Sequence, residues 1–180
     1  MTSDRCNLRA RLRAASGVVL LSLLVSCSPI QVRSKPGTTT TVILTRHADR
    51  DKDSDHLNAK GRARALALVE AVRGMGVTAI YSPDARRNLD TVRPLARELG
   101  IEITITPEMA VFVADEIARD MLERHAGGVI VWVGNVSGNL HAIYHQLGGV
   151  GDPPLEYDEL FVLTLNDNAP VRVEKRRYGP

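Results

Sequence analysis

Between residues 42 and 176, short apolar runs rich in β-branched residues alternate with segments of helical periodicity. The runs have the length of strands, and their continuous apolar character suits strands buried on both faces. We expect strands over 42–45, 79–81, 101–105, 129–133, 160–165 and 171–176, and helices over 58–75, 89–99, 115–124 and 137–147. This alternation predicts one α/β domain, a three-layer α/β/α sandwich around a mostly parallel sheet.

Individual residues set the expected ends of two helices. Asn58 is a good N-cap for the first helix, because its side chain can accept a hydrogen bond from a free backbone N–H. Gly100 is expected to stop the second helix. Pro94 lies inside that second helix and is expected to kink it, since proline lacks an N–H and crowds the preceding turn.

The N-terminus has the pattern of a secretory leader. Four arginines within residues 1–17 precede an apolar run over 18–25, which is too short to cross a bilayer. The run ends in Leu-Val-Ser-Cys, which resembles a bacterial lipobox, so Cys27 is the expected lipidation site. We expect a signal peptide over 1–26, a lipidated cysteine and flexible tether over 27–41, and a domain over 42–180. The alternative is a buried N-terminal helix.

The charge balance changes once this leader is set apart. The whole chain has 23 basic and 21 acidic residues, a net charge of +2, but the leader holds four of the basic residues and one of the acidic ones. The remainder is therefore near neutral at −1. This argues against a nucleic-acid partner. The expected location is the bacterial cell envelope, with the protein attached to a membrane through its lipid anchor.

Three of the expected strands end in residues that can bind an anion. Arg46 and His47 follow the first strand, Arg86 and Arg87 begin the helix after the second, and Asn135 follows the fourth. In such a sheet the ligand lies beyond the carboxyl ends of the strands. Arginines and helix N-termini bind anions, and a histidine among them can attack phosphorus. The sequence thus predicts a phosphate site with a nucleophilic imidazole that requires no metal or organic cofactor.

Five segments resemble, in order, those of the histidine phosphatase (phosphoglycerate mutase-like) superfamily. They are ILTRHADRD, LNAKGRARA, YSPDARRNLDTVRPLARELG, VIVWVGNVSGNLHAIYHQLGG and YDELFVLTL, and the resemblance covers about residues 42–178. It implies a phosphoglycerate mutase-like fold. It also implies that the protein is a phosphoric monoester hydrolase acting on a phosphorylated small molecule or a phosphoprotein.

The resemblance assigns roles to individual residues. His47 matches the histidine that becomes phosphorylated, and Arg46 matches its phosphate-binding neighbour. Arg87 matches the second phosphate-binding arginine; it is preferred over Arg86 because it lies four residues before Thr91, which sets the register. Arg86 is expected to be a substrate-binding residue.

Asn135 departs from the family pattern. The family places a second histidine directly after the glycine of the fourth strand, and asparagine occupies that position here. A carboxamide donates hydrogen bonds but carries no positive charge. Two functions therefore remain open: a phosphomonoesterase weakened at Asn135, acting through a phosphohistidine, and a non-catalytic lipoprotein that binds a phosphorylated ligand or a protein. A mutase is less favoured, because the domain is short.

Further side chains have candidate roles beside the main group. Asp115 and Glu116 are candidates for the acid that protonates the leaving oxygen, although both also suit the N-terminus of a helix. His56 follows the first motif and is a candidate substrate-binding residue at the mouth of the site. The pair His141 and His145 is assigned to an ordinary helix face, with no metal.

Overall fold

The computed structural model describes residues 32–108 and 110–180. Six of the described segments form one sheet in the order β3-β2-β4-β1-β5-β6. The strands are β1 (Thr39–Arg46), β2 (Val77–Pro83), β3 (Ile103–Thr106), β4 (Val129–Gly134), β5 (Glu159–Asn166) and β6 (Arg172–Arg177). The first four strands pair in parallel, whereas β5 and β6 pair antiparallel at one side. The predicted mostly parallel sheet is confirmed.

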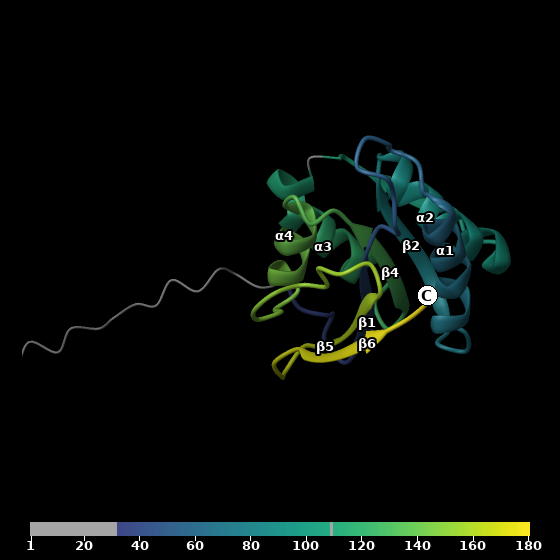
Figure 1. The fold of residues 1–180 in the computed structure, drawn as a ribbon. Helices are drawn as coiled ribbons and strands as arrows, with labels where there is room; N and C mark the ends of the chain where they lie inside the picture. The colour runs from purple at the N-terminus through teal and green to yellow at the C-terminus, as the bar shows by residue number, and fades with distance from the viewer. Residues whose placement is uncertain (1–31, 109) are drawn as a thin grey trace, which may run out of the picture.

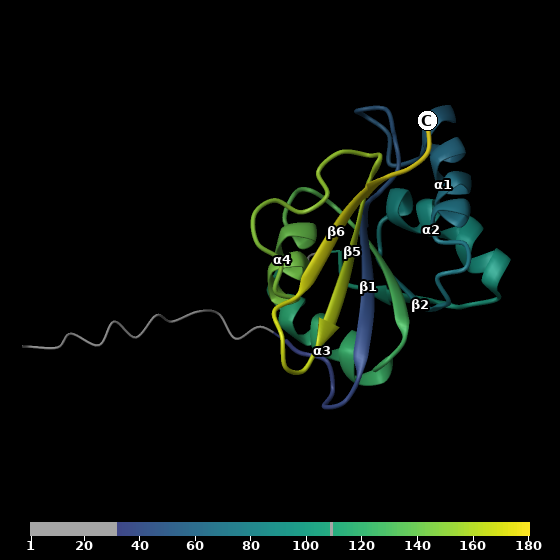
Figure 2. The same cartoon turned by 90° about the horizontal axis from the view of Figure 1, so that it is seen from below.

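The helices cover both faces of this sheet. They are α1 (Ala59–Ala71), α2 (Arg86–Leu99), α3 (Ala114–Arg124) and α4 (Asn139–Gln146), with a 3-10 turn over Ala110–Val113. Figure 1 shows α1 and α2 grouped together on the side opposite α3 and α4. The view from below in Figure 2 shows the sheet between these two pairs. The three-layer α/β/α sandwich predicted from the alternation is therefore confirmed.

The core consists of two apolar layers, one on each face of the sheet. Ile43 contributes to the layer beneath α1 and α2, and the next residue, Leu44, contributes to the layer beneath α3 and α4. Val131 and Trp132 divide in the same way along β4. Successive side chains of a strand point to opposite faces, so a strand covered on both sides needs apolar residues at every position.

Local sequence accounts for the ends of the helices that carry the site. Asn58 caps α1 as predicted, with its side-chain oxygen accepting a hydrogen bond from Gly61 N at 2.9 Å. Gly100 ends α2 in the left-handed conformation, at φ 64°. The helix α1 ends at Ala71, before the predicted residue 75, and α2 continues through Pro94 as one helix that begins at Arg86.

Residues 32–41 are the described part of the expected flexible tether, and the structure shows them packed against the domain instead. Strand β1 already begins at Thr39, and Thr40 is fully buried. The hydroxyl of Ser34 lies 2.6 Å from that of Thr40, and the N–H of Val32 donates to Gln146 O at 3.0 Å. Threonine favours strands, and these polar groups find partners on the domain, so this segment packs against it.

The expected signal peptide over 1–26 and the lipidation site Cys27 lie outside the described residues. Within the described residues, every helix is too short or too polar to cross a membrane.

Candidate active site

His47 follows the carboxyl end of β1 and is held by the neighbouring strand. Its backbone N–H donates to Gly134 O, at the end of β4, over 3.0 Å. The residue is 3% exposed, and its ring Nδ1 lies 2.9 Å from Ala48 O. A carbonyl can only accept, so Nδ1 carries the proton in this contact. The lone pair of the neutral ring is therefore on Nε2, the nitrogen that would act as nucleophile.

The surroundings of His47 keep its imidazole neutral. Burial is the main cause that lowers the pKa of His47, to about 4, and the positive charges of Arg46, Arg87 and Arg50 lower it further. The hydrogen bond to Ala48 opposes this shift only in part. At neutral pH the ring is thus unprotonated, which is the state that a nucleophile requires.

Arg46 is positioned by the loop before β5. Its Nη1 donates to Leu155 O at 2.9 Å, and its guanidinium carbon lies 3.9 Å from the centre of the Tyr157 ring. The same ring meets His47 edge-on, with 5.6 Å between ring centres. Tyr157 therefore contacts both Arg46 and the candidate nucleophile. The carboxylate of Glu159 steadies this loop by accepting from Leu155 N at 2.8 Å.

Arg87 meets three acceptors from three separate segments. Its Nε donates to Asn135 Oδ1 at 2.8 Å, its Nη2 donates to Glu108 Oε1 at 3.2 Å, and its Nη1 pairs with Asp55. Asp55 also accepts from the backbone N–H of Arg86 at 3.0 Å, in the first turn of α2. Burial opposes ionisation of Asp55, but the hydrogen bond and the charge of Arg87 outweigh it and hold its pKa below the usual value.

Asn135 lies at the carboxyl end of β4 and is 4% exposed. Its backbone N–H donates to Asn139 Oδ1 at 2.7 Å, and Asn139 Nδ2 donates to Glu108 O at 3.3 Å. These bonds connect the end of β4, the start of α4 and the segment after β3. Because Oδ1 of Asn135 accepts from Arg87, the NH₂ group is the end of the amide that remains to donate.

Thr91 connects the helix that carries Arg87 to Ala48, the residue after the candidate nucleophile. Its hydroxyl donates to Arg87 O at 2.7 Å and accepts from the N–H of Ala48 at 2.9 Å. Thr91 is fully buried, so this link is shielded from water. The structure thus places four predicted residues together at the carboxyl ends of the parallel strands: Arg46, His47, Arg87 and Asn135.

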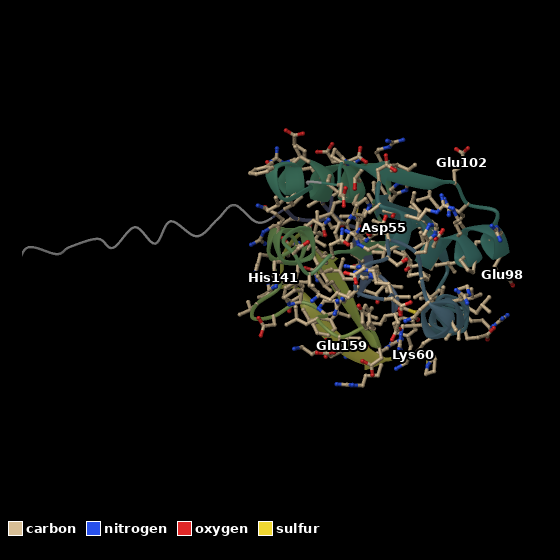
Figure 3. The ribbon with its side chains drawn as sticks, turned by 45° about the horizontal axis from the view of Figure 1, so that its top comes forward. Asp55, Lys60, Glu98, Glu102, His141 and Glu159 are labelled. Atoms are coloured by element: carbon tan, nitrogen blue, oxygen red, sulfur yellow. The ribbon has the colours of Figure 1, made fainter. Side chains whose placement is uncertain are left out.

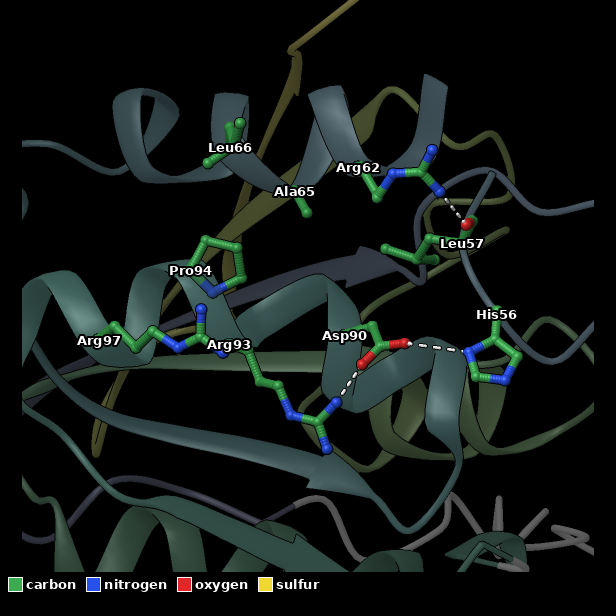
Figure 4. Close-up of a pocket in the computed structure, with 9 residues that line it drawn as sticks. All are labelled: His56, Leu57, Arg62, Ala65, Leu66, Asp90, Arg93, Pro94 and Arg97. Carbon is green, nitrogen blue, oxygen red and sulfur yellow. Dashed lines mark hydrogen bonds and ion pairs between the residues drawn. The ribbon is translucent and has the colours of Figure 1, made fainter. Parts of the chain in front are cut away.

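Two other predicted residues lie beside this group, along α2. The Arg86 side chain is 56% exposed and its Nε lies 3.7 Å from Asp90. The His56 side chain is 66% exposed, and its Nδ1 lies 3.9 Å from the same carboxylate, as Figure 4 shows. Both side chains therefore contact Asp90, on the flank of α2.

The carboxyl groups at the site differ from those singled out in the sequence. Asp115 pairs with Arg119 on its own helix at 3.3 Å, and Glu116 is exposed on the same first turn. The carboxylates that contact Arg87 are Asp55 and Glu108. Glu108 comes two residues after β3, whereas the sequence pattern drew attention to the ends of three other strands. Its position just after a strand end is the signal that could have identified Glu108. No sequence signal points to Tyr157.

Three further histidines belong to the helices α3 and α4: His125 ends α3, and His141 and His145 lie on α4. In Figure 3, Asp55 is labelled near the centre of the view and His141 to its left. The rings of His141 and His145 are 6.3 Å apart, and His145 Nδ1 lies 3.0 Å from Gly149 O. Within residues 32–108 and 110–180, no group of three or more His, Cys, Asp or Glu side chains could hold a metal ion.

Comparison with known proteins relates the sequence to phosphatases. The family model for the histidine phosphatase superfamily (branch 1) matches residues 38–111. An 8-oxo-(d)GTP phosphatase from Mycolicibacterium smegmatis is 38% identical over 104 residues, which is 52% of this chain and 32% of the relative. The chain thus spans about a third of that curated relative's length.

Solved structures agree in fold at low sequence identity. The protein histidine phosphatase SixA, complexed with tungstate, superposes with a TM-score of 0.60 at 13% identity, covering 76% of this chain and 96% of that one. Bacillus stearothermophilus YhfR superposes with a TM-score of 0.54 at 18% identity, covering 74% and 95%.

Proposed function

We propose that the chain is a member of the histidine phosphatase superfamily, whose family model matches residues 38–111, and that it hydrolyses phosphomonoesters through a phosphohistidine on His47. The observation that carries the proposal is the state of that residue. Its Nδ1 is held by Ala48 O, and burial lowers its pKa to about 4, so a neutral ring offers Nε2 among three arginines.

In the first step, Nε2 of His47 attacks phosphorus, a P–N bond forms and the P–O bond to the leaving group breaks. Arg46 and Arg87 bind the oxygens of the transferring phosphoryl group and offset their charge. In the second step, water attacks phosphorus, phosphate leaves and the neutral imidazole is restored. No metal or organic cofactor takes part in either step.

We assign the proton transfers to Glu108 rather than to Asp115 or Glu116. Its carboxyl group contacts Arg87 at 3.2 Å, whereas Asp115 is paired with Arg119 on α3. Glu108 would protonate the leaving oxygen in the first step and take a proton from water in the second, so the protons balance over one cycle.

The substrate class stays broad: a phosphorylated small molecule or a phosphoprotein. The relative from M. smegmatis is named for 8-oxo-(d)GTP, but this chain spans only 32% of it. We also propose that the protein is a lipoprotein of the bacterial cell envelope, with residues 1–26 as signal peptide and Cys27 as lipidation site. That part of the proposal rests on the basic and apolar pattern of the leader.

The activity is tested with 4-nitrophenyl phosphate. The wild-type protein is expected to release phosphate, and His47→Asn is expected to abolish the release. His141→Asn is the matched control and is expected to behave as wild type, because His141 lies on α4, where its ring neighbours that of His145. Release that persists in His47→Asn contradicts the mechanism.

A second function, non-catalytic binding of a phosphorylated ligand, is favoured by one observation. Asn135 replaces a group that can carry positive charge, and it is buried against Arg87. This function predicts that wild-type protein binds inorganic phosphate, measured by calorimetry, without turning over the aryl ester.

A further inference from the structure

A groove runs between α1 and α2 (Figure 4). Its first hollow has a volume of about 460 Å³ and an apolar floor that includes Leu57, Ala65, Leu66 and Pro94. Leu66 is 63% exposed, although it is a large apolar side chain. We call this feature the α1–α2 groove.

The rim of the first hollow of the α1–α2 groove is positively charged. Arg62, Arg93 and Arg97 line this hollow, and the single acidic residue in its lining is Asp90. Asp90 is already shared between Arg93 and Arg86, so its charge is offset. Among the described residues, no carboxylate lies within ion-pair distance of Arg62 or Arg97. The rim therefore has an excess of positive charge that an anionic ligand would balance.

The groove adjoins the phosphate-binding arginine through two adjacent residues. His56 lies at one end of the groove, and the residue before it, Asp55, pairs with Arg87. Asp90 also lies three residues after Arg87 on α2. A ligand whose phosphoryl group is held at Arg87 thus has the groove beside it.

The groove continues away from the site. A second hollow of about 610 Å³ shares Leu66, Pro94 and Arg97 with the first. A third, of about 260 Å³, shares Val69 and Glu98 with the second. This extended path suits a chain-like ligand more than a compact one. Of the described residues that line these hollows, none is Phe, Tyr or Trp, so only His56 and the arginines could stack on nucleic-acid bases.

We propose that the α1–α2 groove docks an acidic, leucine-bearing segment of a phosphoprotein substrate. Its carboxylates would pair with Arg62, Arg93 and Arg97, and its apolar side chains would cover Leu66 and Pro94. The inference rests on the proposed phosphatase function, and it narrows the substrate class to phosphoproteins.

Direct binding is the first test. The probe is a fluorescein-labelled peptide of alternating glutamate and leucine pairs, measured by anisotropy, and the control peptide has glutamine in place of glutamate. Arg97→Glu is expected to raise the Kd of the acidic peptide about tenfold, and Arg97→Gln by less. Arg119→Glu changes an exposed arginine on α3 by the same charge and is expected to leave the Kd unchanged. Equal Kd values for the two peptides, or for the two Glu variants, would overturn the proposal.

Turnover is the second test. A peptide with a phosphorylated residue beside the same acidic segment is compared with 4-nitrophenyl phosphate. Arg97→Glu is expected to raise KM for the phosphopeptide at least tenfold more than KM for the aryl ester. An equal change in both overturns the docking role. If the wild-type protein turns over neither substrate, the proposed phosphatase function is refuted. The anisotropy measurement with the unphosphorylated peptides then still tests the docking role of the groove by itself. The proposal is also overturned if the wild-type protein binds single-stranded DNA or anionic vesicles instead of the peptide and the Arg97→Glu variant loses that binding.

Discussion

The Nε of Arg87 donates a hydrogen bond to Oδ1 of Asn135 over 2.8 Å, so a buried carboxamide orients the guanidinium that we propose binds phosphate. This places asparagine inside the site as a hydrogen-bonding member. It also uses the oxygen end of the amide and leaves its NH₂ group as a neutral donor. The position is therefore polar and preorganised, but it lacks the positive charge that a histidine can supply.

Asn135→His is expected to raise kcat/KM for 4-nitrophenyl phosphate by about tenfold. Removal of one preorganised donor commonly costs about 10²–10³ in rate, and asparagine still supplies a weaker donor, so only part of that range is recoverable. Steady-state kinetics measures the change. Asn135→Leu is the opposite control and is expected to lower kcat/KM, because it removes both the donor and the acceptor for Arg87. An unchanged kcat/KM in Asn135→His shows that the missing charge does not limit turnover.

Tyr157→Ala is expected to raise KM for the aryl phosphate by about five- to tenfold. The ring lies 3.9 Å from the guanidinium carbon of Arg46, and such contacts contribute about 0.5–2 kcal/mol. Tyr157→Phe keeps the ring and is expected to stay within about twofold of wild type. If Phe and Ala give the same KM, the hydroxyl group rather than the ring determines the role of Tyr157.

His47 is expected to make stability fall as the solution is acidified. In the folded protein its pKa is lowered to about 4, mainly by burial, whereas in the unfolded chain it titrates near 6.5. Between these two pKa values the unfolded state binds a proton that the folded state does not bind. The contribution of His47 to the free energy of unfolding is therefore complete above pH 6.5 and is lost as the pH falls toward 4. The full shift in the pKa of His47 corresponds to about 3 kcal/mol in that free energy.

Urea unfolding at pH 7 and pH 4.5 measures this dependence. His47→Gln has no titrating ring, so its free energy of unfolding is expected to fall less over the same interval. An equal fall in both proteins would show that other groups carry the acid sensitivity.

Gly61→Ala is expected to destabilise the protein by about 1–3 kcal/mol. A Cβ at this position would lie 1.9 Å from Asp49 O, so α1 or the segment after His47 has to move. Helix propensity alone predicts the opposite sign, because alanine favours a helix by about 1 kcal/mol over glycine. Ala63→Gly, on the exposed face of α1, is the propensity control and should cost about 1 kcal/mol. A stabilised Gly61→Ala protein contradicts the close approach.

Short-range patterns were enough for much of the fold. The apolar runs predicted the strands because buried strands need apolar residues on both faces, and Asn58 and Gly100 marked helix ends through local hydrogen bonding and backbone conformation. The polar composition of residues 32–41 favours a tether, whereas in the fold the N–H of Val32 donates to Gln146 O and the hydroxyl of Thr40 accepts from Gly127 N. Local composition does not report such partners, because they lie far away in the sequence.

The sequence by itself determined the α/β class, the resemblance to histidine phosphatases, and the grouping of His47, Arg46, Arg87 and Asn135 at strand ends. Each follows from a local pattern, or from the rule that parallel strands end at one edge of a sheet. Only the tertiary structure decided that Asp55 and Glu108 contact Arg87, that Tyr157 stacks on Arg46, and that α1 and α2 leave an arginine-lined groove between them. These depend on segments far apart in the chain, whose approach is set by packing across the whole sheet.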